Sequence, residues 1–193
     1  MLTMMPMAAC DGSNADPILP EQPGQPGNSD GGDEDDSTNP TNPIPGGNGR
    51  YLVLYCSRTG STERMAQQIQ QTLDCDILEV EPQTPYESDY NGMLNRAQEE
   101  LAAIRQGNYP AIKTSVEDFG NYDIVFVGYP IWYGSMATPM QTFLHNHASK
   151  LAGKRIALFA SSGSSGISAS VDEARTLCSG ATFTETLLLT SST

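Results

Sequence analysis

The chain has 193 residues and a formal net charge of −13, with 23 acidic residues against 10 lysines and arginines. This acidic balance, without any basic patch, argues against nucleic acid as a partner. No apolar run in the body of the chain is long enough to span a bilayer.

The composition changes near residue 50. Residues 1–49 contain eight acidic residues and no lysine or arginine, so all ten bases lie in 50–193. Residues 11–49 are rich in Pro, Gly, Asn, Ser and Asp, and such a segment cannot bury enough apolar surface to offset its ordering entropy. We therefore predict a disordered tether over 11–49 and one folded domain over 50–193.

The chain begins with a segment that ends in Met-Ala-Ala-Cys10, which resembles the lipobox of a bacterial lipoprotein. The resemblance implies a partial signal over 1–10, acylation of Cys10, and a domain anchored by lipid to the cell envelope. The segment departs from a signal peptide because it has no basic residue and only a short apolar run. The alternative is a chance Met- and Ala-rich start on a cytoplasmic protein.

From Tyr51 onward, short apolar runs alternate with segments of helical periodicity. Met65, Ile69 and Leu73 fall four apart on one helix face. Four consecutive apolar residues in 123–128 are typical of a central parallel strand covered on both faces. The pattern predicts strands over 51–56, 76–80, 123–128, 156–161 and 183–189, and helices over 62–73, 89–105, from 138 onward and over 167–178.

This alternation predicts an α/β fold in which a parallel sheet carries helices on both faces. Thr138 and Pro139 predict an N-cap hydroxyl followed by proline at the first helical position. Gly180 predicts a C-cap after the last helix. Ligands of such sheets bind beyond the carboxyl ends of the strands, which makes the loops there the candidate site.

The loop after the first strand has the composition of a phosphate site. Ser57, Thr59, Ser61 and Thr62 place four hydroxyls within six residues, and Gly60 lets the backbone approach a ligand closely. The helix that follows adds unpaired N–H groups and the positive end of its dipole. The loop lacks the lysine of nucleoside-triphosphate loops and the repeated glycines of dinucleotide loops, so it suits a phosphomonoester. The alternative is an ordinary turn whose hydroxyls cap the helix.

Three segments together, 51–62, 122–134 and 154–166, resemble the flavodoxin family, and the resemblance extends over about residues 50–189. It implies a doubly wound five-stranded parallel sheet in the order 2-1-3-4-5, with non-covalently bound FMN. Flavodoxins end with a helix after the fifth strand, whereas only Thr190 to Thr193 follow here, so we expect this C-terminal helix to be missing. Either the sequence is truncated, or the uncovered sheet surface pairs with another copy.

The resemblance implies that residues of all three loops bind FMN: Ser57, Arg58, Thr59, Gly60, Ser61, Thr62, Pro130, Ile131, Trp132, Tyr133, Gly134, Ser161, Ser162, Gly163, Ser164, Ser165 and Gly166. The first loop would hold the phosphate, and 161–166 would offer backbone N–H groups to the polar edge of the ring. Trp132 is expected to stack on the flavin, with Tyr133 as the alternative for that role. Gly134 matches a glycine whose peptide turns toward the flavin, which requires tolerance of positive φ.

Several of these residues have plainer alternatives. Arg58 either pairs with the phosphate or is a solvated surface arginine. Trp132 could serve packing alone, and 161–166 could be a flexible linker. Tyr86 and Tyr90 could lie near the flavin, although core or surface packing is the favoured interpretation.

The cysteines and histidines suggest neither a metal site nor a nucleophile. Cys56, Cys75 and Cys178 have no Cys-x-x-Cys spacing, and we expect them to be buried as small apolar residues. A phosphatase or arsenate reductase of related topology would need an arginine six residues after Cys56, at position 62. That position is a threonine, which argues against this class of enzyme. His145 and His147 lie two apart on a helix and therefore point in different directions.

Together these observations favour an FMN-binding electron carrier, whose partner is a redox protein or a small-molecule electron acceptor. One alternative is an FMN-dependent NAD(P)H or quinone reductase of the same fold, for which the sequence has no nicotinamide signature. The other is a non-catalytic, lipid-anchored module that has lost flavin, suggested by Ser61 where the family frequently has Asn. A homodimer is a further partner prediction.

Overall fold

The computed structural model describes residues 50–190. The predicted signal over 1–10, the acylation of Cys10 and the tether over 11–49 lie outside the described residues. Within residues 50–190, no helix has the length and apolar character needed to cross a membrane.

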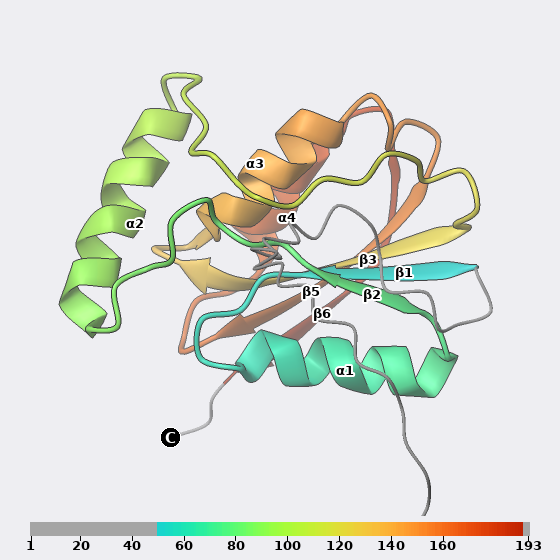
Figure 1. Ribbon diagram of the computed structural model, residues 1–193, viewed down its shortest axis with the longest axis horizontal. Helices are drawn as coiled ribbons and strands as arrows, with labels where there is room; N and C mark the ends of the chain where they lie inside the picture. Colours follow the sequence, from blue (N-terminus) through green and yellow to red (C-terminus); the bar gives the residue numbers. More distant parts are fainter. Residues whose placement is uncertain (1–49, 191–193) are drawn as a thin grey trace, which may run out of the picture. The chain divides into compact units, whose positions relative to one another are not determined.

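Within residues 50–190, five parallel strands form the central sheet, and the segments between them are mostly helical (Figure 1). The strands are β1 (Tyr51–Tyr55), β2 (Asp76–Glu79), β3 (Ile124–Trp132), β5 (Arg155–Ser162) and β6 (Thr182–Thr190). They lie in the order β2-β1-β3-β5-β6, with each neighbouring pair parallel. Counted as five strands, this is the predicted order 2-1-3-4-5, which is confirmed.

The expected strand over 123–128 extends further than its apolar run. β3 continues to Trp132 because β4 (Ser135–Met136) folds back and pairs antiparallel with its end. Tyr133 and Gly134 form the two-residue turn between them, and both have positive φ, 52° and 81°. Such turns match the twist of the flanking strands, which favours glycine at one position and makes Tyr133 an unusual occupant of the other.

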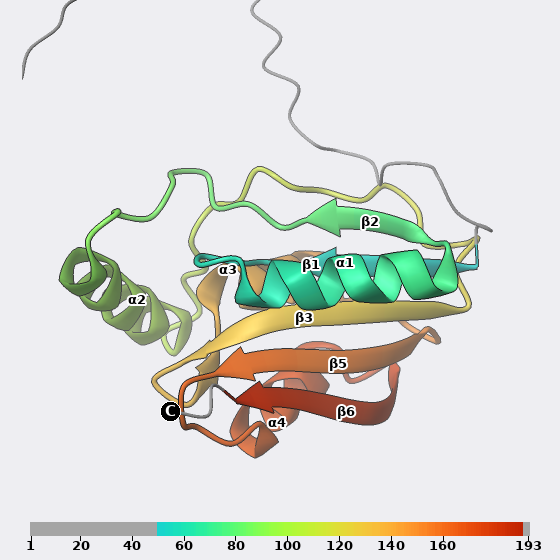
Figure 2. The same cartoon turned by 90° about the horizontal axis from the view of Figure 1, so that it is seen from below.

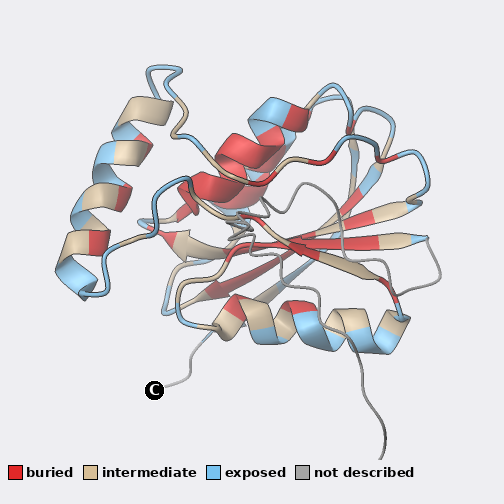
Figure 3. Ribbon diagram, viewed as in Figure 1, coloured by how far each residue is buried: buried red, intermediate tan, exposed pale blue. Residues whose placement is uncertain are grey.

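Residues 50–190 form four helices: α1 (Ser61–Leu73), α2 (Tyr90–Ile104), α3 (Thr138–His147) and α4 (Ser168–Leu177). α2 stands beside the sheet and packs against α3 (Figure 1). α1 lies on one face, and α3 and α4 lie on the other (Figure 2). Most of α3 is buried (Figure 3). The predicted row Met65, Ile69 and Leu73 packs on the α1 side, against a cluster that contains Val53 and Phe159, which confirms the predicted face.

Two predicted helix caps are wrong. Ala137 precedes α3 without capping it through a side chain, while the Thr138 hydroxyl binds Tyr86 and Glu100 instead. A tertiary partner has therefore replaced the local cap. α4 ends at Leu177, and Gly180 is not in the left-handed region that a C-cap glycine occupies. A Cβ at Gly180 would lie 3.1 Å from the Ala152 Cβ, so close packing is the observed constraint there.

His147 is a buried structural residue at the end of α3. Its Nε2 accepts a hydrogen bond of 3.1 Å from the Val116 N–H, and its Nδ1 lies 2.8 Å from the Phe143 carbonyl oxygen. The ring therefore carries its proton on Nδ1 and is neutral. Burial lowers the pKa of His147 below its ordinary value of 6.5. His145, in contrast, is exposed and stacks on Tyr109, so the two rings point in different directions as predicted.

We expect His147 to make the domain less stable as the pH falls from about 7 to about 5. The unfolded imidazole binds a proton below its ordinary pKa, whereas the buried ring resists protonation, so acid favours the unfolded state. Urea denaturation at several pH values should show a weaker pH dependence of the unfolding free energy for His147→Gln. The matched variant His145→Gln should keep the wild-type dependence. An unchanged dependence in His147→Gln would contradict this assignment.

Candidate functional site

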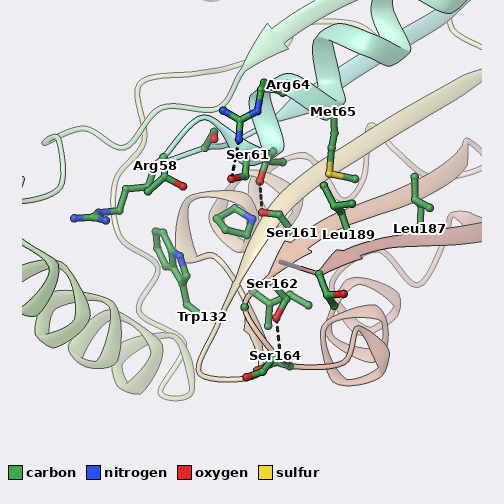
Figure 4. A pocket seen from close by; sticks show the side chains of 18 of the residues that line it. Arg58, Ser61, Arg64, Met65, Trp132, Ser161, Ser162, Ser164, Leu187 and Leu189 are labelled. Carbon is green, nitrogen blue, oxygen red and sulfur yellow. Dashed lines mark hydrogen bonds between the residues drawn. The ribbon is translucent and has the colours of Figure 1, made fainter. Parts of the chain in front are cut away.

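The loops after β1, β3 and β5 meet at one edge of the sheet and line a cleft of about 1010 Å³ (Figure 4). These strands are neighbours, so their carboxyl ends meet there. All the predicted site residues line this cleft except Gly60, Gly134 and Gly166. Of these three glycines, Gly60 and Gly134 have positive φ, 79° and 81°, and therefore shape the turns of their loops.

The first loop presents the start of α1 to the cleft. Gly60 is the residue before the helix and has a left-handed backbone with φ of 79°. Its N–H donates a 3.1 Å hydrogen bond to the Ser57 Oγ, which closes the loop on itself. Among the described residues no side chain caps α1, so the N–H groups of its first turn are available to an anion.

The hydroxyls of this loop have different surroundings. Thr62 is buried, and its Oγ1 lies 2.8 Å from the Ser161 Oγ, which ties the first loop to the third. Ser61 lines the cleft and accepts a hydrogen bond of 3.3 Å from the Arg64 guanidinium. Thr62 thus holds two loops together, while Ser61 and Thr59 face the cleft.

Two arginines flank the first loop in an otherwise acidic protein. The Arg58 guanidinium donates to the carbonyl oxygens of Ser88 and Asp89 at 3.0 and 3.3 Å, and lies 5.9 Å from the Tyr90 ring centroid. Neither sequence interpretation anticipated this bridge to the segment before α2. Arg64 also lines the cleft, and sequence reasoning missed it. Its position was a usable signal, because helical side chains lean toward the N-terminus and this one lies in the first turn.

The second loop places two aromatic rings at the cleft. Trp132 is only 9% exposed and meets the Tyr86 ring edge to face, with centroids 5.0 Å apart. Tyr133, at 54% exposed, lies on the outer side and its hydroxyl reaches the Leu94 carbonyl oxygen at 3.4 Å. Both rings line the cleft, so both offer aromatic surface to a ligand there.

Tyr86, which packs against Trp132, belongs to a network of charged and polar side chains. The Tyr86 hydroxyl binds Glu100 and Thr138, and the Arg96 guanidinium lies 4.1 Å from the Tyr86 ring centroid. Burial and the hydrogen bond to Glu100 raise the pKa of Tyr86, which keeps its hydroxyl protonated. Tyr86 is therefore half-buried and packs against the core, in agreement with the packing role favoured from the sequence, whereas Tyr90 lines the cleft.

The third loop is held by its own serines. The Ser162 Oγ accepts a 2.8 Å hydrogen bond from the Ser165 N–H, and Ser161 is linked to Thr62. Four serines and Gly163 of this loop line the cleft. These bonds give the segment a defined path, in contrast to the alternative of a free linker.

Apolar side chains from three further elements complete the cleft wall, and sequence reasoning assigned none of them to the site. They are Met65 and Ile69 of α1, Met93 and Leu94 of α2, and Leu187 and Leu189 of β6. Helical periodicity had marked those of α1 and α2 as core-facing residues. Their contribution to the cleft depends on how the helices sit on the sheet.

Cys56 does not have the environment of a nucleophile. Its side chain is 4% exposed, and burial together with the neighbouring Glu79 raises the pKa of its thiol. A reactive thiolate needs the opposite, a lowered pKa in a cationic setting. Cys56, Cys75 and Cys178 are all free and buried, as predicted.

Comparison with known proteins gives consistent matches. The family model described as flavodoxin matches residues 50–193. A crystal structure described as a flavoprotein from Bacteroides eggerthii is 34% identical, with a TM-score of 0.64, and the match covers 72% of this chain and 87% of that one. A flavoprotein from Lactobacillus acidophilus, solved in complex with FMN, is 26% identical with a TM-score of 0.62, over 72% and 92%. A protein from Bacteroides uniformis is 28% identical with a TM-score of 0.64, over 77% and 94%. A comparison with curated proteins found no significant match.

Proposed function

We propose, since this chain belongs to the flavodoxin family, that it is an electron carrier which holds FMN non-covalently in the cleft. The observation that carries this proposal is the uncapped start of α1, which opens into the cleft beside Ser61 and Arg64. The related flavoprotein from Lactobacillus acidophilus was solved with FMN, and the cofactor of this chain is FMN.

The first loop fits the phosphate of FMN. The N–H groups of the first turn of α1 and the Ser61 hydroxyl supply hydrogen-bond donors, and Gly60 leaves the approach open. Arg64 lies within reach of the same place through its contact with Ser61 and adds positive charge. The loop lacks the lysine that loops for nucleoside triphosphates carry, which agrees with a phosphomonoester as the ligand.

The remaining loops fit a planar ring with one polar edge. Trp132 and Tyr133 provide aromatic surface, and the backbone of 161–166 provides donors and acceptors for the ring edge. When bound, FMN supplies the redox chemistry, and the protein orients it and sets the surrounding charge. We propose a redox protein or a small-molecule acceptor as the partner in electron transfer.

Titration of FMN with the full-length chain tests the site. We expect quenching of FMN fluorescence at micromolar or lower concentration, and binding about 10-fold or more weaker in Trp132→Ala because stacking area is lost. Tyr133→Ala is the matched variant, and we expect a smaller loss. A larger loss in Tyr133→Ala would move the stacking role to Tyr133. Absence of quenching by the folded protein would exclude the FMN site and leave a non-catalytic module.

Turnover separates the carrier from a reductase on the same fold. The FMN-loaded protein can be mixed with NADH or NADPH and a quinone, and nucleotide oxidation followed in the absorbance. We expect none above the rate of free FMN. Steady oxidation that depends on the loaded protein would favour the reductase.

A further inference from the structure

β6 is an edge strand whose outer side has no neighbour among the described residues (Figure 2). Every second residue of such a strand turns its N–H and C=O groups outward, which makes an edge a template for another strand. The pairing with β5 shifts register early in β6 and is then regular from Thr186 to Thr190. This regular part is the section able to accept a further strand.

The same section carries exposed apolar side chains. Leu187 and Leu189 are 58% and 52% exposed, and the other exposed large apolar residues among those described are Tyr90 and Tyr133. Leu187 lies opposite Phe159 in the sheet, so both leucines face the α1 side. Both leucines line the cleft together with Met65, and Figure 4 shows Leu189 next to Met65. Apolar residues on an unpaired edge favour association.

We propose that two copies of this chain associate through antiparallel pairing of their β6 strands, centred on Leu188. The sequence Thr186-Leu-Leu-Leu-Thr190 reads the same in both directions. In this register Thr186 lies opposite Thr190 of the second copy, and Leu187 lies opposite Leu189. Two such leucine pairs form one apolar cluster on the α1 side, and the Thr pairs flank the centre.

Charge within β6 does not oppose a second copy as the occupant. Glu185 is the one charged residue of β6, and the proposed register keeps the two copies of Glu185 about 20 Å apart, six residues along the strand. A strand pair and four leucines bury less than the roughly 1,200 Å² of stable interfaces, so the dimer is reversible. The proposal does not depend on bound FMN, because the strands pair through their own backbones.

Sedimentation velocity of the full-length Cys10→Ser chain tests the association. We expect monomer and dimer in a concentration-dependent equilibrium, with a dissociation constant below about 1 mM. Leu187→Lys and Leu189→Lys should each weaken it 10-fold or more, because a charge then enters the leucine cluster. Thr182→Lys lies in the same strand outside the symmetric sequence and should behave as the parent does. A monomer throughout this range, or equal dimerisation of the Leu and Thr variants, overturns the proposal.

Disulfide trapping tests the register without relying on those variants. Thr186→Cys and Thr190→Cys chains, both with Cys10→Ser, should form a mixed disulfide when combined, because directly opposite Cα atoms lie about 4.5–5.5 Å apart. Each chain alone should not, since its two cysteines would lie about 13 Å apart. The three natural cysteines of the described domain are buried and do not compete. Disulfides formed equally within each single-variant sample overturn the register.

Discussion

Ser61→Asp is expected to weaken FMN binding on the order of 100-fold or more, while riboflavin binding and folding stay intact. Ser61 lies in the first turn of α1 and lines the cleft beside Arg64. A carboxylate there opposes the phosphate dianion and also draws Arg64 toward itself. Riboflavin has no phosphate and should be indifferent to the new charge.

The substitution separates binding from stability because the two effects have opposite signs. An acidic residue in the first turn of a helix stabilises it by about 0.3–1 kcal/mol, so a misfolded variant is not the expected cause of lost binding. Ser61→Asn is the matched neutral control and should bind FMN nearly as the parent does. Isothermal titration with FMN and with riboflavin measures both. Equal losses for the two ligands would place the phosphate elsewhere.

Gly128→Ala is expected to destabilise the domain by about 3 kcal/mol, at the upper end of typical overpacking costs. A Cβ at Gly128 would lie 2.1 Å from the Phe159 Cζ and 2.3 and 2.8 Å from two further ring atoms. Phe159 is 2% exposed within the cluster under α1, so its ring has little room to move. Either the ring or the two paired strands must shift.

Urea denaturation measures this cost, and Gly163→Ala is the matched control. Gly163 has no positive φ, and a Cβ there meets nothing within 4 Å, so we expect a change within about 0.5 kcal/mol. Phe159→Leu in the Gly128→Ala background should lower the cost of the alanine, because the clashing ring is gone. Additive effects of Gly128→Ala and Phe159→Leu would contradict a direct clash.

The sequence alone predicted the fold because its signals are local. The row Met65, Ile69 and Leu73 specifies which face of α1 packs inward, whatever the helix packs against. The apolar run in 123–128 identified a central strand, and β3 indeed lies between β1 and β5. The strand order came from the family resemblance, since alternation of strand and helix leaves several orders possible.

The candidate loops were also predictable, because hydroxyls and glycines after apolar strands mark turns that can hold an anion. The functions of single residues within them were not. Arg58 was expected to meet phosphate or water, but its partners are carbonyls about thirty residues away in the chain. Thr62 was grouped with the phosphate hydroxyls, yet it bonds Ser161, 99 residues further on.

The residue pattern along the chain was enough to specify the inward faces of α1 and α2, the buried strands and the composition of the loops. The tertiary structure alone decided which polar groups meet across the sheet. It also decided that the Thr138 hydroxyl bonds Tyr86 and Glu100 instead of capping α3. It also placed Arg64 at the cleft and left Leu187, which lines the same cleft, exposed. The physical reason is that a side chain takes the most favourable partner within reach, and packing decides which distant residues come within reach.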